Sequence, residues 1–114
     1  MTEYQLIQGE SSQSFDIGYA DPDTGELVVL GADDLCTLHV VQSIQNQKEQ
    51  AIVELNSFPK SLDGLYFKTK LKPSDSELLK SGDYYIVWKL VNIAKDFALE
   101  HQAKLKVLPS GIHN

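Results

Sequence analysis

Apolar and polar side chains alternate at every second position over several stretches of this chain, and this period of two restricts the fold more than any other feature. In segment 65–71, Leu65, Phe67 and Leu71 fall on one side, while Lys68 and Lys70 fall on the other. Lysines along one face fit a strand of an antiparallel sheet that is half exposed to water. Segment 84–91 has the strongest pattern, with an apolar row formed by Tyr84, Ile86, Trp88 and Leu90.

Weaker strand patterns occur along the rest of the chain, in segments 4–7, 14–20, 27–30, 36–44, 51–55, 97–101 and 103–108. Turn-forming residues separate them at 21–25, 45–50, 62–65 and 80–83. Short strands divided by frequent turns indicate a sandwich or barrel. We therefore predict one all-β domain over residues 1–109, an antiparallel two-sheet sandwich of about seven strands.

Two further segments complete the predicted layout. Residues 72–80 predict one turn of helix between the sheets, and residues 110–114 predict a disordered carboxy-terminal tail. The predicted core consists of Phe15 or Ile17, Leu38, Val40, Phe67, Leu71, Ile86, Trp88, Leu90, Leu105 and Val107.

Charge excludes several classes of function. The 114 residues carry a net charge of −6 and include no arginine, which argues against nonspecific binding of nucleic acid. The longest apolar runs are four to five residues, so we expect no membrane helix, and the start of the chain has no secretory pattern. The lone cysteine, Cys36, fits a reducing compartment, and we expect it to be a buried apolar residue.

The charge is uneven along the chain. Residues 1–57 have a net charge of −9, and residues 58–114 have a net charge of +3. This asymmetry fits a self-complementary surface on which copies of the chain stack into a homo-oligomer. The favoured interpretation is a fold in which strands from both halves interleave and mix the charges.

No residue pattern predicts catalysis, a cofactor or a metal. His39 and His101 are expected on solvent-side strand positions and His113 in the tail, away from any nucleophile or metal spacing. The turn at 21–26 begins like a calcium loop, but Gly25 and Ala32 occupy positions where ligands are needed, so a hairpin turn is the favoured interpretation. The acidic pair at 33–34 is interpreted as a solvated loop.

The most specific local pattern is Leu79-x-x-Gly82-x-Tyr84, followed by Ile86. It resembles the tyrosine corner of Greek-key sandwiches, in which the tyrosine hydroxyl donates a hydrogen bond to upstream backbone. We therefore predict structural roles for Tyr84, Gly82 and Trp88. The cysteine that follows this tyrosine in antibody domains is absent, so the core is expected to be apolar and free of disulfides.

The order of motifs over residues 14–108 resembles the immunoglobulin-like amino-terminal domain of phage baseplate upper proteins and related tail accessory proteins. The matching elements are the turn 21–25, Leu30-Gly31-Ala32 before the strand 36–41, the run 62–67, segments 75–79 and 81–85, and the final strand pair 97–101 and 103–108.

The resemblance implies an immunoglobulin-like Greek-key sandwich and a non-catalytic subunit of a phage or prophage tail or baseplate, in the virion or the host cytoplasm. Its partners are expected to be other phage structural proteins. Such domains usually attach a protein to the particle, and a carboxy-terminal portion recognises the host. Because the sequence stops where the domain ends, an adaptor, plug or decoration role is expected instead of host recognition.

The outward row of segment 84–91 predicts where a partner binds, through Tyr85, Val87, Lys89 and Val91. Three of these four side chains are apolar or aromatic on a side expected to face solvent, which is typical of an interface. Alternatively, another strand or the amino-terminal segment covers the row. A different function, binding of a carbohydrate or small ligand, would use exposed aromatics such as Tyr19, Tyr66 and Tyr85.

Overall fold

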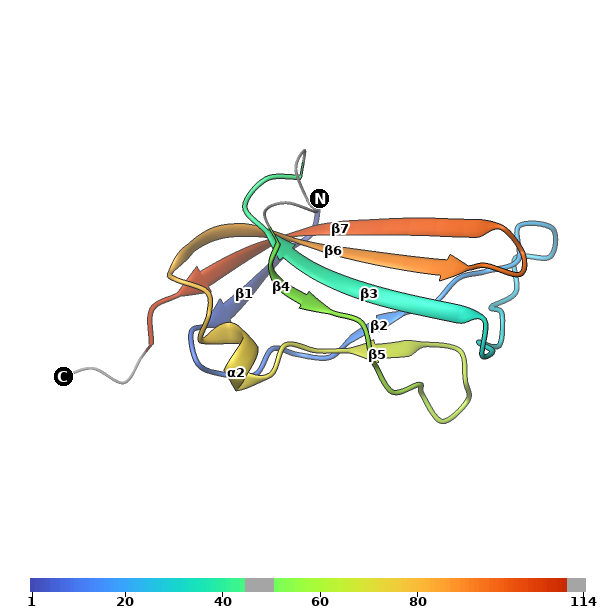
Figure 1. Ribbon diagram of the computed structural model, residues 1–114, viewed down its shortest axis with the longest axis horizontal. Helices are drawn as coiled ribbons and strands as arrows, with labels where there is room; N and C mark the ends of the chain where they lie inside the picture. The colour runs from blue at the N-terminus through green and yellow to red at the C-terminus, as the bar shows by residue number, and fades with distance from the viewer. Residues whose placement is uncertain (45–50, 111–114) are drawn as a thin grey trace.

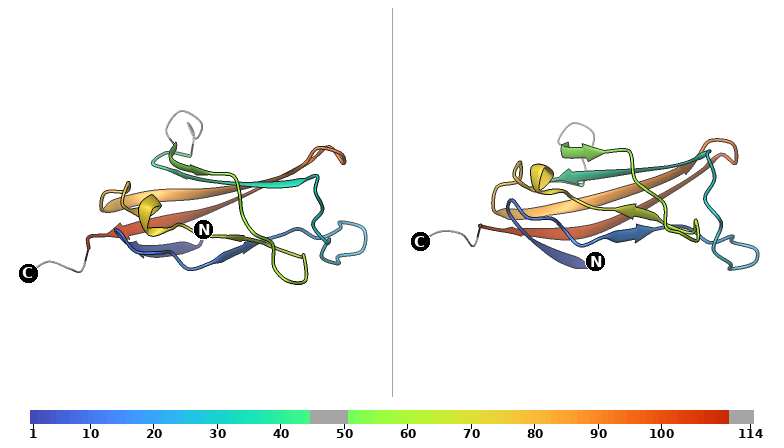
Figure 2. Two further views of the ribbon diagram at one scale, coloured as in Figure 1. Left: turned by 60° about the horizontal axis from the view of Figure 1, so that its bottom comes forward. Right: turned by 90° about the horizontal axis from the view of Figure 1, so that it is seen from below.

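The structure is a computed structural model that describes residues 1–44 and 51–110. In the described residues it contains seven strands and one short helix, arranged as two facing layers (Figures 1 and 2). The elements in chain order are β1 (Glu3–Ile7), β2 (Phe15–Ile17), β3 (Asp34–Val41), β4 (Ala51–Leu55), β5 (Phe67–Thr69), α2 (Pro73–Ser76), β6 (Gly82–Asn92) and β7 (Phe97–Leu108).

The strands form a large sheet in the order β1-β7-β6-β3-β4 and a small sheet of β2 and β5. The predicted two sheets and about seven strands are confirmed. The prediction of a wholly antiparallel fold is wrong, because β1 runs parallel to β7, with Glu3 opposite Lys104 and Ile7 opposite Leu108. A parallel pair requires a long connection, and the whole chain between β1 and β7 supplies it.

Strands from both halves of the sequence alternate in the large sheet, since β6 and β7 lie between β1 and β3. The strands of the two halves therefore interleave. This agrees with the interpretation that folding mixes the acidic and basic halves of the sequence. The acidic connection between β2 and β3 projects from one end of the sandwich (Figure 1).

Several predicted strands have wrong bounds, including segment 14–20, in which only Phe15–Ile17 form β2. Residues 27–30 form no strand, because their backbone groups bond to two different partners: Val28 N donates to Tyr19 O at 3.0 Å and Leu30 N to Gly64 O at 2.8 Å. Segments 97–101 and 103–108 form one strand, which pairs with β6 without a break. The strand predicted at 36–44 begins earlier and ends at Val41, while the predicted turn 45–50 lies outside the described residues, as do residues 111–114 of the predicted tail.

The core lies between the two sheets and contains every residue predicted for it. The Phe15 and Trp88 rings pack edge to face at 5.2 Å, joining β2 to β6. Trp88 Nε1 donates a hydrogen bond to Thr69 Oγ1 at 2.9 Å, and that hydroxyl donates to Phe15 O at 2.9 Å. The buried polar atoms of the core are thus satisfied across both layers.

The predicted turn of helix is present as α2, which leads into β6. Tyr84 is buried at the start of β6, and its hydroxyl donates a hydrogen bond to Lys80 O at 2.7 Å. This is the upstream backbone bond that the tyrosine-corner pattern predicted. Gly82 has a φ of 149°, a conformation that residues with a side chain rarely adopt.

Candidate functional site

The outer row of β6 differs from the exposed surface predicted for it. Val87 is completely buried, while Tyr85, Lys89 and Val91 are half-buried. Because β6 is a central strand, Val87 lies between the longer side chains of His39 on β3 and Gln102 on β7. The expectation that Val87 faces solvent is wrong, and the side chain offers no exposed surface to a partner. The amino-terminal strand does not lie over this row either, since β1 extends the same sheet at its edge.

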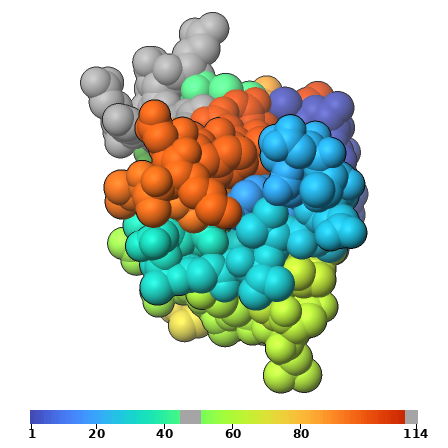
Figure 3. All heavy atoms as spheres, turned by 90° about the vertical axis from the view of Figure 1, so that its right-hand side faces the viewer, coloured from blue at the N-terminus to red at the C-terminus, as the bar shows by residue number. Residues whose placement is uncertain are grey.

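Exposed apolar side chains gather instead at one end of the sandwich. We define the acidic end as residues 21–35, 60–65 and 93–96, which meet on the face shown in Figure 3. Of the nine large hydrophobic side chains that are exposed in the described residues, five belong to this end. They are Leu27, Val29, Leu35, Leu62 and Ile93.

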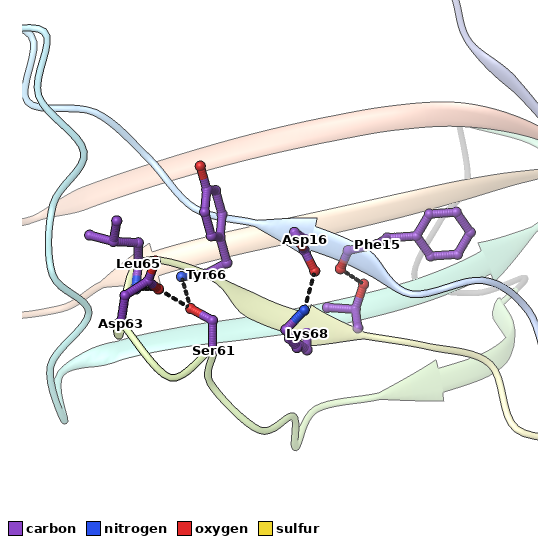
Figure 4. A network of polar contacts seen from close by, with 8 residues as sticks. Phe15, Asp16, Ser61, Asp63, Leu65, Tyr66 and Lys68 are labelled. Carbon is purple, nitrogen blue, oxygen red and sulfur yellow. Dashed lines mark hydrogen bonds and ion pairs between the residues drawn. The ribbon is translucent and has the colours of Figure 1, made fainter.

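Two segments of the acidic end, 21–35 and 60–65, are joined to each other by hydrogen bonds. Leu30 N donates to Gly64 O at 2.8 Å, and Lys60 Nζ donates to Gly31 O at 3.1 Å. Within the 61–66 turn, Ser61 Oγ donates to Asp63 Oδ1 at 2.6 Å, and Tyr66 N donates to Ser61 Oγ at 3.1 Å (Figure 4). These bonds hold the exposed apolar side chains on an ordered scaffold.

Asp34 ties the acidic end to the core, which corrects its interpretation as part of a solvated loop. The residue is buried; Oδ1 accepts hydrogen bonds from Asn92 Nδ2 at 2.7 Å and Tyr19 Oη at 3.1 Å, and Oδ2 accepts from Gly31 N at 2.8 Å. Burial by itself raises the pKa of Asp34. The three hydrogen bonds and the charge of Lys95 outweigh burial and hold the pKa below its usual value of 3.8.

Carboxylates share the acidic end with the exposed apolar side chains. Six acidic residues there are exposed or partly exposed, against two lysines, Lys60 and Lys95. The carboxylates belong to Asp21, Asp23, Glu26, Asp33, Asp63 and Asp96. An apolar patch rimmed by one sign of charge favours a partner surface of the opposite sign.

A second feature is a groove between two parts of the chain. One is the end of β4 with the residues that follow it, and the other is segment 68–75, which begins in β5. The cavity of the groove has a volume of about 740 Å³, a size typical of ligand-binding clefts. We call it the lysine groove. It is lined by Ser14, Glu54, Leu55, Asn56, Ser57, Phe58, Pro59, Lys68, Lys70, Lys72, Ser74 and Asp75.

The three lysines of the groove differ in their partners. Lys68 forms an ion pair with Asp16, with 3.3 Å between Nζ and Oδ1 (Figure 4). Within the described part of the chain, the ammonium groups of Lys70 and Lys72 have no ion pair or hydrogen bond. The groove therefore offers two unpaired positive charges on a protein whose net charge is −6.

The residues considered for catalysis do not assemble into a site. His39 is mostly buried, not solvent-facing as predicted, and its Nε2 lies 3.3 Å from Glu54 Oε1, whereas His101 is exposed. Cys36 is buried as predicted, and burial raises the pKa of its thiol to about 12. Over residues 1–44 and 51–110, no three histidine, cysteine or acidic side chains lie close enough to hold a metal ion, and no helix is long and apolar enough to cross a membrane.

The tyrosines considered for carbohydrate binding do not form a common surface. Tyr19 is buried, stacks on Phe97 at 4.8 Å and donates its hydroxyl to Asp34. It cannot present an exposed ring to a sugar. Tyr66 and Tyr85 are half-buried, and they line two different cavities.

Comparison of the sequence with models of known protein families gives no match, and no curated protein matches it either.

Proposed function

We propose that this chain is a non-catalytic, immunoglobulin-like domain that docks onto other proteins through its acidic end, as a structural or adaptor subunit of a phage tail or baseplate. The observation that carries the docking role is the cluster of five exposed apolar side chains held at one end of the sandwich. Exposed apolar clusters with a polar rim mark interaction surfaces.

The order of the strands supports the immunoglobulin-like part of the proposal. The run β7-β6-β3-β4 corresponds to the G-F-C-C′ order of variable-type sandwiches, and β2 with β5 corresponds to the B–E pair of the opposite sheet. Tyr84 then lies at the start of strand F, where the tyrosine corner belongs. Assignment to a phage particle rests on the resemblance in motif order alone.

The partner of the acidic end should present an apolar surface rimmed by lysine or arginine. The carboxylates would attract such a surface and orient it, and the leucine, isoleucine and valine side chains would supply most of the affinity through burial. Because the rim carries few positive charges, a second copy docking end to end would bring like charges together. A different protein is therefore the partner that the charges favour.

The test is co-expression of the chain with the proteins encoded by genes on either side of its own, followed by purification and measurement of affinity. We expect a phage tail or baseplate protein to bind. The Val29→Lys variant should weaken binding at least about tenfold, since it places a positive charge in the apolar patch. Leu78→Lys is the matched control, because Leu78 is similarly exposed but lies outside the acidic end.

Two results would contradict the proposal in different ways. If none of the neighbouring genes encodes a phage structural protein that binds, the assignment to a phage particle fails. If a partner binds Val29→Lys as tightly as the unaltered chain, the docking surface lies elsewhere.

A further inference from the structure

We propose that the lysine groove receives an extended acidic peptide from another protein, which joins the large sheet as an added strand along the free edge of β4. The proposal is independent of docking through the acidic end, because the two surfaces share no lining residue.

The first argument is the backbone of β4. This strand is the last of the large sheet and pairs only with β3, so the backbone groups on its other side have no partner in the described residues. Exposed strand edges are templates for pairing with another chain, and several domains bind peptides in this way. The outer edge of β5 is less open, since Lys68 N donates to Pro59 O at 2.8 Å.

The second argument is the spacing of the lysines. Lys68, Lys70 and Lys72 alternate with the buried side chains of Phe67, Thr69 and Leu71. Alternate residues of an extended chain recur about every 7 Å along the backbone, so the three lysines leave the chain at about that repeat. An extended peptide with carboxylates at every second residue has the same repeat and can pair with Lys70 and Lys72.

The third argument is the opposite wall of the groove. Leu55 and Phe58 are half-buried there beside Pro59, and they offer apolar contacts to a peptide. Glu54 and Asp75 also line the groove. These carboxylates and the net charge of −6 oppose a polyanion such as a nucleic acid, whereas a peptide with few, spaced acidic residues avoids them.

The experiment measures binding of a fluorescent synthetic peptide of about seven residues that alternates glutamate with valine. Two comparison peptides separate the arguments. One groups the same glutamates together, and the other carries N-methyl groups on alternate amides, which removes the hydrogen bonds that an added strand requires. We expect the alternating peptide to bind at least about tenfold more tightly than either comparison peptide.

Variants of the chain test the lysines. A double variant that carries Lys70→Glu and Lys72→Glu should bind the alternating peptide at least about tenfold more weakly. The matched control exchanges Lys104→Glu and Lys106→Glu, two exposed lysines with the same spacing on β7, and it should bind as the unaltered chain does. Hydrogen exchange on the unaltered chain adds a measurement that needs no variant, since the peptide should slow exchange of β4 amides.

Several outcomes would overturn the proposal. One is that the alternating peptide does not bind, or that the N-methylated peptide binds with equal affinity. Another is that the control variant loses as much affinity as the Lys70/Lys72 variant, or that a single-stranded oligonucleotide binds more tightly than the peptide. Unchanged exchange in β4 with bound peptide would also reject strand addition. None of these results depends on Val29 or on a phage partner, so failure here is distinguishable from failure of the proposed function.

Discussion

The two faces of β6 are both apolar in sequence, but the structure uses them differently. The inner row carries three polar groups, and each is hydrogen-bonded: Tyr84 to Lys80, Trp88 to Thr69 and Asn92 to Asp34. The outer row has Val87 fully buried at its centre, with half-buried neighbours on either side.

The difference shows that an apolar row on the outside of a sheet need not be an interface. A short side chain in a central strand is covered by longer neighbours on the adjacent strands, whereas a loop at the end of a sandwich has no such neighbours. Among the described residues, five of the nine exposed large apolar side chains accordingly lie at the acidic end.

The largest effect is expected from Val87→Asp, the substitution that most directly separates the two interpretations of the outer row. A carboxylate at this fully buried position loses its hydration, so we expect a loss of more than about 4 kcal/mol and failure to fold. The measurement is a chemical denaturation curve beside that of the unaltered chain. A folded variant that no longer associates would restore the outer row as an interface.

The next largest effect concerns the polar end of the inner row. Asp34→Ala removes the acceptor shared by Tyr19, Asn92 and Gly31, and it should lower the free energy of unfolding by about 3 kcal/mol because buried donors are left unpaired. Asp33→Ala is the control, since Asp33 is exposed and should change stability little. Equal losses in both variants would contradict the role given to Asp34.

The dependence of stability on acidic pH should also report on the Asp34 carboxylate. The folded pKa of Asp34 is below its usual value of 3.8, so its stabilisation is fully present above pH 3.8 and is lost as the pH falls through the folded pKa. In denaturation curves recorded from pH 6 to pH 2, Asp34→Asn should change less steeply with pH than the unaltered chain. Parallel pH profiles would show that Asp34 does not contribute.

Much of the fold was predictable, because it follows from local alternation. The β6 segment and the core residues that were predicted follow from a period of two, and the Tyr84 bond follows from a short motif. The parallel pairing of β1 with β7 was not predictable, since alternation within a strand does not specify its neighbour.

The candidate surfaces were harder to predict than the fold. The acidic end combines three segments that are distant in sequence, and the lysine groove combines β4 with the chain around β5. Burial of Asp34 had one sequence signal, the strand predicted to begin two residues later at Cys36, but its donors Tyr19 and Asn92 lie far away along the chain.

A smaller effect is expected at the other polar end of the inner row. Tyr84→Phe removes the hydroxyl that donates to Lys80 O and leaves a carbonyl without that partner, at a cost of about 1 kcal/mol. The measurement is the midpoint of urea unfolding. Tyr85→Phe, on the half-buried outer row, is the control that should leave the midpoint nearly unchanged. An unchanged midpoint for Tyr84→Phe would remove the tyrosine corner as a stabilising feature.

The smallest effect on stability is expected from Val91→Lys, at the end of the outer row. Val91 is half-buried and lies opposite Leu35, whose side chain is exposed at the acidic end. A lysine can keep its stem on this surface and its charge in water, so the free energy of unfolding should change by less than about 1 kcal/mol. Because the new charge would face a basic partner, docking should weaken while the melting curve stays unchanged. If the variant unfolds, the whole outer row belongs to the core. If the variant docks normally, the interface is confined to the loops.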